Sequence, residues 1–367
     1  MTSVVDATAM LDDVAELVAR ESPSDDLDAV ARCADVVAEL GQRRLGSAPE
    51  RLVVDGRAHL RWQFGPPRVV LLGHFDTVWP LGTLARWPFG VDGDVMTGPG
   101  VFDMKAGIVQ MFAALAGLEN RDGVVVLLTS DEEIGSGNAQ PLIEETCRSA
   151  RAVLVLEPSA DGALKVARKG VGMFQVDIVG RAAHAGLEPH NGINASVEAA
   201  HVILAAAGFA RPDAGTTVTP TVVSSGTTVN TVPAQASVAV DVRAETVGEM
   251  QRVEQALQSV SPHLPGASLK LVTRSLRQPL ERAMSADLFA AAQQLAAELG
   301  FDALDGVSVG GGSDGNITAG LGVPTLDGLG AVGGNAHAEN EWASASAMPE
   351  RAALVAALVR DLLEDTP

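Results

Sequence analysis

Short apolar runs that alternate with helix-forming segments constrain the fold more than any other feature of this sequence. Runs rich in Val and Leu cover residues 68–72, 124–129 and 152–156, and helical periodicity marks residues 105–118 and 141–150. A strand that is apolar at every position is buried on both of its faces. Strands of this kind, separated by helices, are typical of a mostly parallel sheet that is flanked by helices. The sequence therefore predicts an α/β domain.

The order of predicted elements changes in the middle of the chain. The expected elements are strand 171–179, helix 194–207, strands 216–224 and 236–244, helix 248–260 and strand 268–274. This β-α-β-β-α-β order is the ferredoxin-like arrangement. Because helix and strand alternation resumes afterwards, we predict one domain made of residues 1–167 and 277–367, with a ferredoxin-like α+β domain of residues 168–276 inserted into it.

Composition narrows the class of protein. The 367 residues include 26 Lys and Arg against 46 Asp and Glu, a formal net charge of −20 that argues against nucleic acid as a partner. The acidic N-terminus does not resemble a signal peptide, and no apolar stretch reaches the roughly 18 residues that span a bilayer. Cys33 and Cys147 are the only cysteines, which fits a reducing compartment. We expect a cytoplasmic protein that does not bind membranes.

Polar side chains follow the predicted strands where each strand ends. His74 and Asp76 follow the first apolar run, Glu132 and Glu133 follow the second, and Glu157 follows the third. In open α/β sheets ligands bind beyond the carboxyl ends of the strands, so these side chains are the first candidates for a site.

Two loops add further candidates, Asp103 after a glycine-rich turn and His337 in Gly-Gly-Asn-Ala-His. Imidazole and carboxylate together suit a borderline metal such as zinc, and the lack of thiolates argues against a closed structural site. A salt-bridge cluster is the alternative, but only Lys105 lies near these segments. His59 and His201 are expected to be structural, and His263 to be exposed.

Spacing suggests separate roles within these motifs. In extended backbone His74 and Asp76 share a face, so Asp76 is placed to orient the imidazole. Adjacent Glu132 and Glu133 in a strand-like conformation would point in opposite directions, so that one binds metal and the other acts as a general base. The run that contains Gly311 and Gly312 lacks the Lys-Ser/Thr of a phosphate loop, and fits a backbone that approaches substrate.

The motifs GHFDTVW, GPGVFDMKAG, SDEEIGS, LEPS, GRAAHAG, NTVPA, GGGSDG and AHAENEW occur in this order. In order and spacing they resemble the di-zinc peptidase family that includes bacterial glutamate carboxypeptidase, acetylornithine deacetylase, succinyl-diaminopimelate desuccinylase and aminoacylase. The resemblance covers nearly the whole chain and is greatest to the glutamate carboxypeptidase branch.

The resemblance implies two zinc ions per subunit, with Co or Mn as substitutes. Asp103 would bridge the two ions. His74 and Glu157 would complete one site, and Glu133 and His337 the other.

The resemblance also implies roles for other residues. Glu132 would be the general base, with Asp76 orienting a ligand. The inserted domain would be a lid and homodimerisation domain, in which His184 reaches the partner's active site to stabilise the oxyanion. Asn230 would contact substrate, and Arg277 would bind its carboxylate.

Two departures from the family pattern bear on specificity. Arg-Gln-Pro at residues 277–279 replaces the usual Arg-Pro, which leaves Arg274 and Arg282 as alternatives for the carboxylate. Gly-Asn follows Ser313-Asp314, where small residues are more usual in the family.

The expected function is amide hydrolysis by a zinc carboxypeptidase that releases a C-terminal glutamate-like amino acid from a peptide or N-acyl conjugate. The substrate would be a small molecule or short peptide with a free carboxylate. A deacylase of N-acyl amino acids is the second hypothesis. A non-catalytic metal-binding or peptide-binding protein is a third, and the presence of Glu132 disfavours it.

Overall fold

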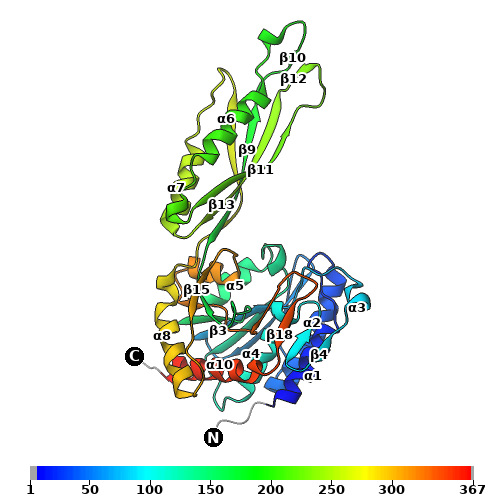
Figure 1. Cartoon of the computed structure of the whole chain (residues 1–367), viewed down its shortest axis with the longest axis vertical. Helices are drawn as coiled ribbons and strands as arrows, with labels where there is room; N and C mark the ends of the chain where they lie inside the picture. Colours follow the sequence, from blue (N-terminus) through cyan, green and yellow to red (C-terminus); the bar gives the residue numbers. More distant parts are fainter. Residues whose placement is uncertain (1–5, 365–367) are drawn as a thin grey trace. The chain divides into compact units, whose positions relative to one another are not determined.

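The computed structural model describes residues 6–364, and these form two compact units. The first unit comprises residues 6–167, 282–309 and 313–364, and the second comprises residues 168–281 and 310–312. Figure 1 shows each unit with its own sheet and its own helices.

A six-stranded sheet forms the centre of the first unit. β3 pairs in parallel with both β6 and β7, and β16 extends this parallel part beyond β7. β1 and β2 add an antiparallel hairpin on the other side of β6. The spatial order is β1 (Glu50–Val54), β2 (Arg57–Phe64), β6 (Val124–Thr129), β3 (Val69–His74), β7 (Ala152–Val155) and β16 (Thr325–Leu326).

Helices cover both faces of this sheet. Alternate residues of β3 face opposite cores: Val69 and Leu71 belong to one, Val70 and Leu72 to the other. The first core is covered by α1 (Ala7–Val18), α2 (Leu27–Leu45), α4 (Ala106–Ala116), α8 (Arg282–Glu298) and α10 (Ala347–Glu364). The second is covered by α5 (Gln140–Cys147) and α9 (Asp314–Gly320). The predicted fold, a mostly parallel sheet flanked by helices, is confirmed.

The two cysteines lie in helices on opposite sides of the sheet. Cys33 of α2 packs in the first core, and Cys147 of α5 packs in the second. Both are free thiols and both are buried.

The β1–β2 hairpin was absent from the sequence-based prediction. Its turn is Asp55-Gly56, with φ values of 46° and 82° that suit a tight turn between antiparallel strands. Asp-Gly between two runs of alternating polarity is a recognised hairpin signal, so the sequence contained the information.

The second unit is a four-stranded antiparallel sheet with two helices packed against it. Its elements follow in the order β9 (Gly170–Val179), α6 (Ala195–Ala207), β11 (Thr217–Ser225), β13 (Gln235–Ala244), α7 (Val247–Gln258) and β14 (Ser268–Arg277). The spatial order β11-β13-β9-β14 is that of a ferredoxin-like sheet. A separate apolar core joins the sheet to α6 and α7.

The described chain also contains shorter elements. They are α3 (Thr83–Arg86), β4 (Gly90–Asp92), β5 (Val95–Thr97), β8 (Leu164–Arg168), β10 (Ala183–His184), β12 (Thr231–Val232), β15 (Gly306–Val309), β17 (Gly333–Gly334) and β18 (Trp342–Ser344). None of the helices between residues 6 and 364 combines the length and apolar character needed to cross a bilayer.

Candidate metal centre

The parallel strands of the first unit bring several predicted site residues to one edge of the sheet. His74 is the last residue of β3, Glu132 and Glu133 follow β6, and Glu157 follows β7. Because β3 lies between β6 and β7, the carboxyl ends of all three strands meet there.

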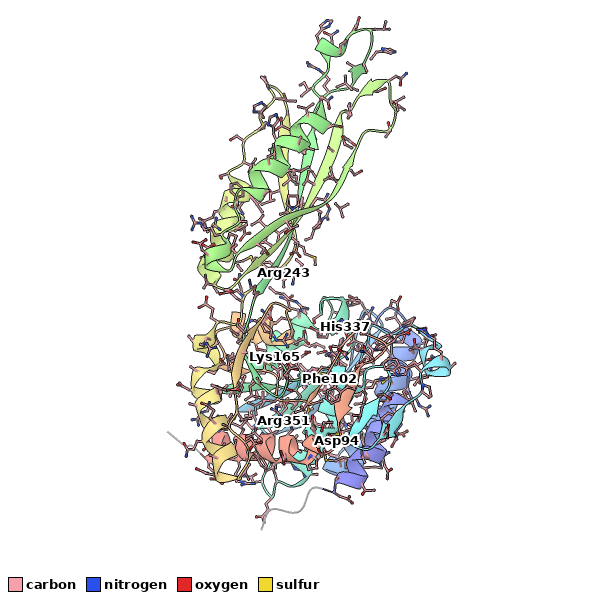
Figure 2. All side chains as sticks on the ribbon, in the orientation of Figure 1. Asp94, Phe102, Lys165, Arg243, His337 and Arg351 are labelled. Carbon is pink, nitrogen blue, oxygen red and sulfur yellow. The ribbon has the colours of Figure 1, made fainter. Side chains whose placement is uncertain are left out.

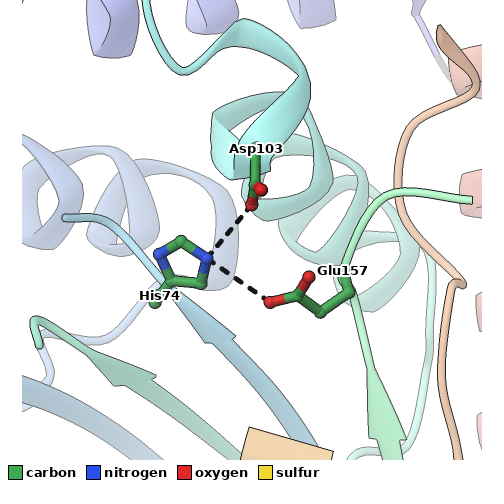
Figure 3. A group of neighbouring side chains, drawn as sticks. All are labelled: His74, Asp103 and Glu157. Atoms are coloured by element: carbon green, nitrogen blue, oxygen red, sulfur yellow. Dashed lines mark hydrogen bonds and ion pairs between the residues drawn. The ribbon is translucent and has the colours of Figure 1, made fainter. Parts of the chain in front are cut away.

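The first cluster consists of His74, Asp103 and Glu157. The His74 Nε2 atom lies 3.2 Å from Asp103 Oδ1 and 3.4 Å from Glu157 Oε1 (Figure 3). The three candidate ligand atoms all lie within 4.8 Å of one another, a spacing that suits one metal ion.

The second cluster consists of Asp103, Glu133 and His337. The His337 Nε2 atom lies 3.5 Å from Asp103 Oδ2 and 3.1 Å from Glu133 Oε2. Asp103 therefore offers one carboxylate oxygen to each cluster, which is the geometry of a bridging ligand.

Asp76 is buried and contacts both His74 and the turn that carries the paired glutamates. The His74 Nδ1 atom lies 3.0 Å from the Asp76 carbonyl oxygen and 3.4 Å from Asp76 Oδ1. The backbone N–H groups of Glu132 and Glu133 donate to the Asp76 carboxylate at 3.3 and 3.2 Å, and the Ser24 hydroxyl donates at 2.7 Å. These contacts fix the imidazole with Nε2 directed at the first cluster.

The electrostatics of the two clusters favour bound cations. Burial lowers the pKa of His74, but its hydrogen bonds to Asp103, Asp76 and Glu157 outweigh burial and raise that pKa well above its usual value. Hydrogen bonds to the carboxylates of Asp103 and Glu133 raise the pKa of His337 to about 10. Imidazoles surrounded in this way hold either a proton or a metal ion, and the two imidazoles and three carboxylates fit a pair of divalent ions.

A further sign of a cation site is the Glu133 carboxylate. Its Oε1 atom is buried and has no hydrogen-bond partner among residues 6–364. An unpaired buried carboxylate oxygen is costly, and a nearby metal ion would offset that cost.

The expectation that Glu132 and Glu133 lie in strand-like backbone is wrong. They begin a short 3₁₀ turn, Glu132–Ile134, because the Gly135 N–H donates to the Glu132 carbonyl at 2.8 Å. Successive residues of a 3₁₀ turn are about 120° apart around the axis, so the two side chains still diverge.

Asp314, which was not among the predicted site residues, supports this turn. Its carboxylate accepts hydrogen bonds from the Thr129 hydroxyl at 3.1 Å and from the Ser136 hydroxyl. Thr129 and Ser136 flank the segment that presents Glu132 and Glu133. The Ser-Asp of the GGGSDG motif was the available signal.

Glu341 was also missed. It is buried, and the backbone N–H of Asp103 donates to its carboxylate at 3.0 Å. Its place four residues after His337 in the AHAENEW motif was the available signal.

The second unit contains His184, Asn230, Arg274, Arg277, Gly311 and Gly312, whereas Arg282 belongs to the first unit. His184 lies in β10, and its Nδ1 atom accepts hydrogen bonds from the N–H groups of Gly186 and Leu187, both at 3.1 Å. Because Nδ1 is an acceptor, Nε2 carries the proton and is a hydrogen-bond donor. The backbone carbonyl group of the neighbouring Asn230 accepts a hydrogen bond from the Ala185 N–H at 2.9 Å.

The arginines proposed to bind the substrate carboxylate lie outside the two clusters, and so does the glycine run. Arg277 ends β14, and Arg274 donates from Nη2 to the Gln175 side chain at 2.9 Å. The carbonyl groups of Gly311 and Gly312 accept from Arg168 Nη1 at 3.1 and 3.2 Å.

The sequence and the fold both match known proteins. Residues 70–361 match the model of peptidase family M20/M25/M40. The chain is 30% identical over 315 residues to carboxypeptidase G2 from Pseudomonas sp. strain RS-16, which covers 81% of this chain and 74% of that protein.

Solved structures show the same fold. Aminopeptidase PepT from Bacillus cereus ATCC 10987 aligns with a TM-score of 0.74 at 21% identity, covering 99% of this chain and 100% of that one. The M20 family metallo-carboxypeptidase Sso-CP2 from Sulfolobus solfataricus aligns with a TM-score of 0.72 at 16% identity, covering 96% of this chain and 98% of that one.

Proposed function

Since the chain belongs to peptidase family M20/M25/M40 and is a metal-dependent hydrolase, we propose that it is a di-zinc carboxypeptidase. It releases a C-terminal, glutamate-like amino acid from a peptide or an N-acyl conjugate. The observation that carries the proposal is the carboxylate of Asp103, which offers one oxygen to each of two clusters. The 30% identity to carboxypeptidase G2 supports the choice of a carboxypeptidase.

In this proposal each ion has two ligands besides the shared Asp103. His74 and Glu157 hold one ion, and Glu133 and His337 hold the other. Zinc is the favoured metal because the donors are imidazoles and carboxylates, and Co or Mn would substitute.

Glu132 is the proposed general base. When bound, the two ions supply Lewis-acid polarisation of the scissile carbonyl and increase the acidity of water. The Glu132 carboxylate accepts a proton from the attacking water and donates it to the leaving amine. Asp76 keeps this base in place, because its carboxylate accepts the Glu132 N–H at 3.3 Å and also lies against His74.

The second unit would bind substrate and pair two subunits. The Nε2–H group of His184 donates a hydrogen bond to the oxyanion in the active site of the partner subunit, as its tautomer permits. Asn230 contacts the substrate, Gly311 and Gly312 let backbone approach it, and Arg277 binds its carboxylate. The two buried free thiols support a reducing location such as the cytoplasm.

A hydrolysis panel tests this function. The zinc-loaded protein is assayed against N-acyl amino acids varied at both halves, including an N-acyl-glutamate, its C-terminal amide and acetylornithine. We expect the highest kcat/KM for the N-acyl-glutamate and a large loss for the amide. Faster hydrolysis of acetylornithine would instead identify a deacylase, and indifference to the terminal carboxylate would contradict a carboxypeptidase. The Glu132→Gln variant controls for contaminating hydrolases.

A further inference from the structure

Glu341 is a charged side chain with no exposed surface, and four hydrogen-bond donors surround it. One carboxylate oxygen accepts from the N–H groups of Phe102 and Asp103 at 2.8 and 3.0 Å. The other accepts from Trp79 Nε1 at 2.9 Å and from the Gly100 N–H at 3.1 Å. Burying a carboxylate is costly unless it is hydrogen-bonded, and this one receives donors at both oxygens.

Three of these donors are backbone groups of one turn, Gly100 to Asp103, and this turn has an unusual conformation. Gly100 has a φ of 73°, and a Cβ there would lie 2.6 Å from Thr77 Cγ2. Asp103 is not helical, with φ −114° and ψ 96°, although it lies in the segment just before α4. Intrahelical hydrogen bonds therefore do not fix the backbone of Asp103, and Glu341 accepts its N–H instead.

Glu341 also belongs to the loop that carries His337. The loop folds back on itself through hydrogen bonds from the Ala338 N–H to the Asn335 carbonyl at 3.0 Å and from the Glu341 N–H to the Ala338 carbonyl at 2.8 Å. Figure 2 labels His337 of this loop and Phe102 of the turn, both in the first unit. Glu341 thus connects the turn that presents Asp103 to the loop that presents a ligand of the second cluster.

We propose that Glu341 is a positioning residue that holds Asp103 in its bridging orientation, so that its loss weakens both metal sites together. The inference rests on the metal centre in the proposed function. The four donors to the Glu341 carboxylate are Trp79 Nε1 and three backbone N–H groups of the turn, so Glu341 contacts the backbone of Asp103 and not its carboxylate. It acts only through Asp103.

Glu341→Gln is the sharpest test because it keeps the size of the side chain. An amide has one oxygen and one NH₂ group, so in either orientation the NH₂ faces two donors. Metal-free protein is titrated with zinc ion alone, in competition with a chromophoric chelator. We expect the affinity for both ions to fall by roughly 10- to 100-fold, as for other residues that orient metal ligands.

Two comparisons make this result specific. Glu339→Gln removes the same charge from the same loop, but Glu339 is exposed and forms an ion pair with Arg86 at 3.1 Å. It should leave both affinities unchanged. His337→Ala should weaken one ion far more than the other, because His337 belongs to a single cluster.

The outcomes separate the inference from the function on which it rests. Weakening of both ions supports a positioning role, whereas wild-type affinities with a lowered unfolding temperature would mean that Glu341 only stabilises the fold. If the wild-type protein binds one ion, the two-metal proposal fails, yet Glu341 is still tested by the affinity for that ion.

A second variant covers the case in which Glu341→Gln does not fold. Trp79→Phe removes one donor and leaves the carboxylate in place. A smaller loss of affinity at both sites would support the inference. No loss, or a loss at one site only, would overturn it.

Discussion

Glu132 and Glu133 are adjacent in sequence but have different surroundings. The Glu133 side chain is only 7% exposed, and its Oε2 atom lies 3.1 Å from His337 Nε2. Burial raises the pKa of Glu133 above its ordinary value. Glu132 belongs to neither candidate cluster, although its N–H is held by Asp76. This difference supports the proposal that the two carboxylates have different roles.

We expect Glu132→Gln to lower kcat by roughly 10² to 10⁴, the usual contribution of general acid–base catalysis, while zinc content stays at the wild-type level. Glu133→Gln should lose one zinc ion, because an amide is a poorer ligand than a carboxylate. Elemental analysis and steady-state kinetics of the two variants check both statements. If both proteins keep their metal and their activity, the roles given to the pair are wrong.

Close packing of secondary-structure elements also shapes the site. A Cβ on Gly107, in the first turn of α4, would lie 2.4 Å from the carbonyl oxygen of Leu156. Leu156 directly precedes Glu157, so glycine at this point lets α4 approach the strand end that presents this candidate ligand.

We expect Gly107→Ala to weaken the first metal cluster. Alanine improves helix propensity by about 1 kcal/mol, but overpacking against backbone costs about 1–3 kcal/mol and displaces the Leu156–Glu157 segment. Zinc titration and urea unfolding measure the two effects separately. Gly137→Ala is the matched control, since a Cβ there meets nothing within 4 Å. Equal zinc affinity in both variants would exclude this role for Gly107.

Local sequence patterns predicted most of these elements, but not their tertiary hydrogen bonds. The uninterrupted run 124–129 was sufficient to predict β6, and the motifs supplied both clusters. Glu341, however, accepts from Gly100, which lies 241 residues earlier, and Asp314 accepts from Thr129, which lies 185 residues earlier. Periodicity describes only residues that are close in sequence, so such partners emerge only from the folded chain.

At the scale of the whole molecule, the second unit has an unpaired strand edge and exposed apolar side chains. β11 is the outermost strand of its sheet and pairs with β13 on one side. Leu204 of α6 is 72% exposed and Val222 of β11 is 67% exposed. An unpaired strand edge can pair with a second copy of the chain, and exposed apolar side chains favour association, so both features support the proposed homodimer.

Mixing two inactive variants tests the proposed dimer and the role of His184 together. His184→Ala should lower kcat by roughly 10² to 10³ without changing zinc content. After subunit exchange with Glu132→Gln, about one quarter of wild-type activity should return, because half of the dimers are mixed and each has one intact site.

Demonstrated exchange without recovery would mean that His184 acts within its own chain or has only a structural role. Light scattering provides the independent measurement of dimer mass.

The two cysteines report on local unfolding of the helix layers that cover the two faces of the sheet in the first unit. Burial raises the pKa of Cys33, and it raises that of Cys147 to about 12, so neither thiol should react with a disulfide reagent in the closed state. Each thiol should therefore be labelled only when a local unfolding fluctuation detaches its helix, α2 or α5, from the sheet. Pulse labelling followed by mass spectrometry would give a separate opening rate for each face, and adding zinc would show whether metal slows the two faces equally. Equal rates would mean that the first unit opens as one cooperative body, and unequal rates would identify the helix layer that detaches first.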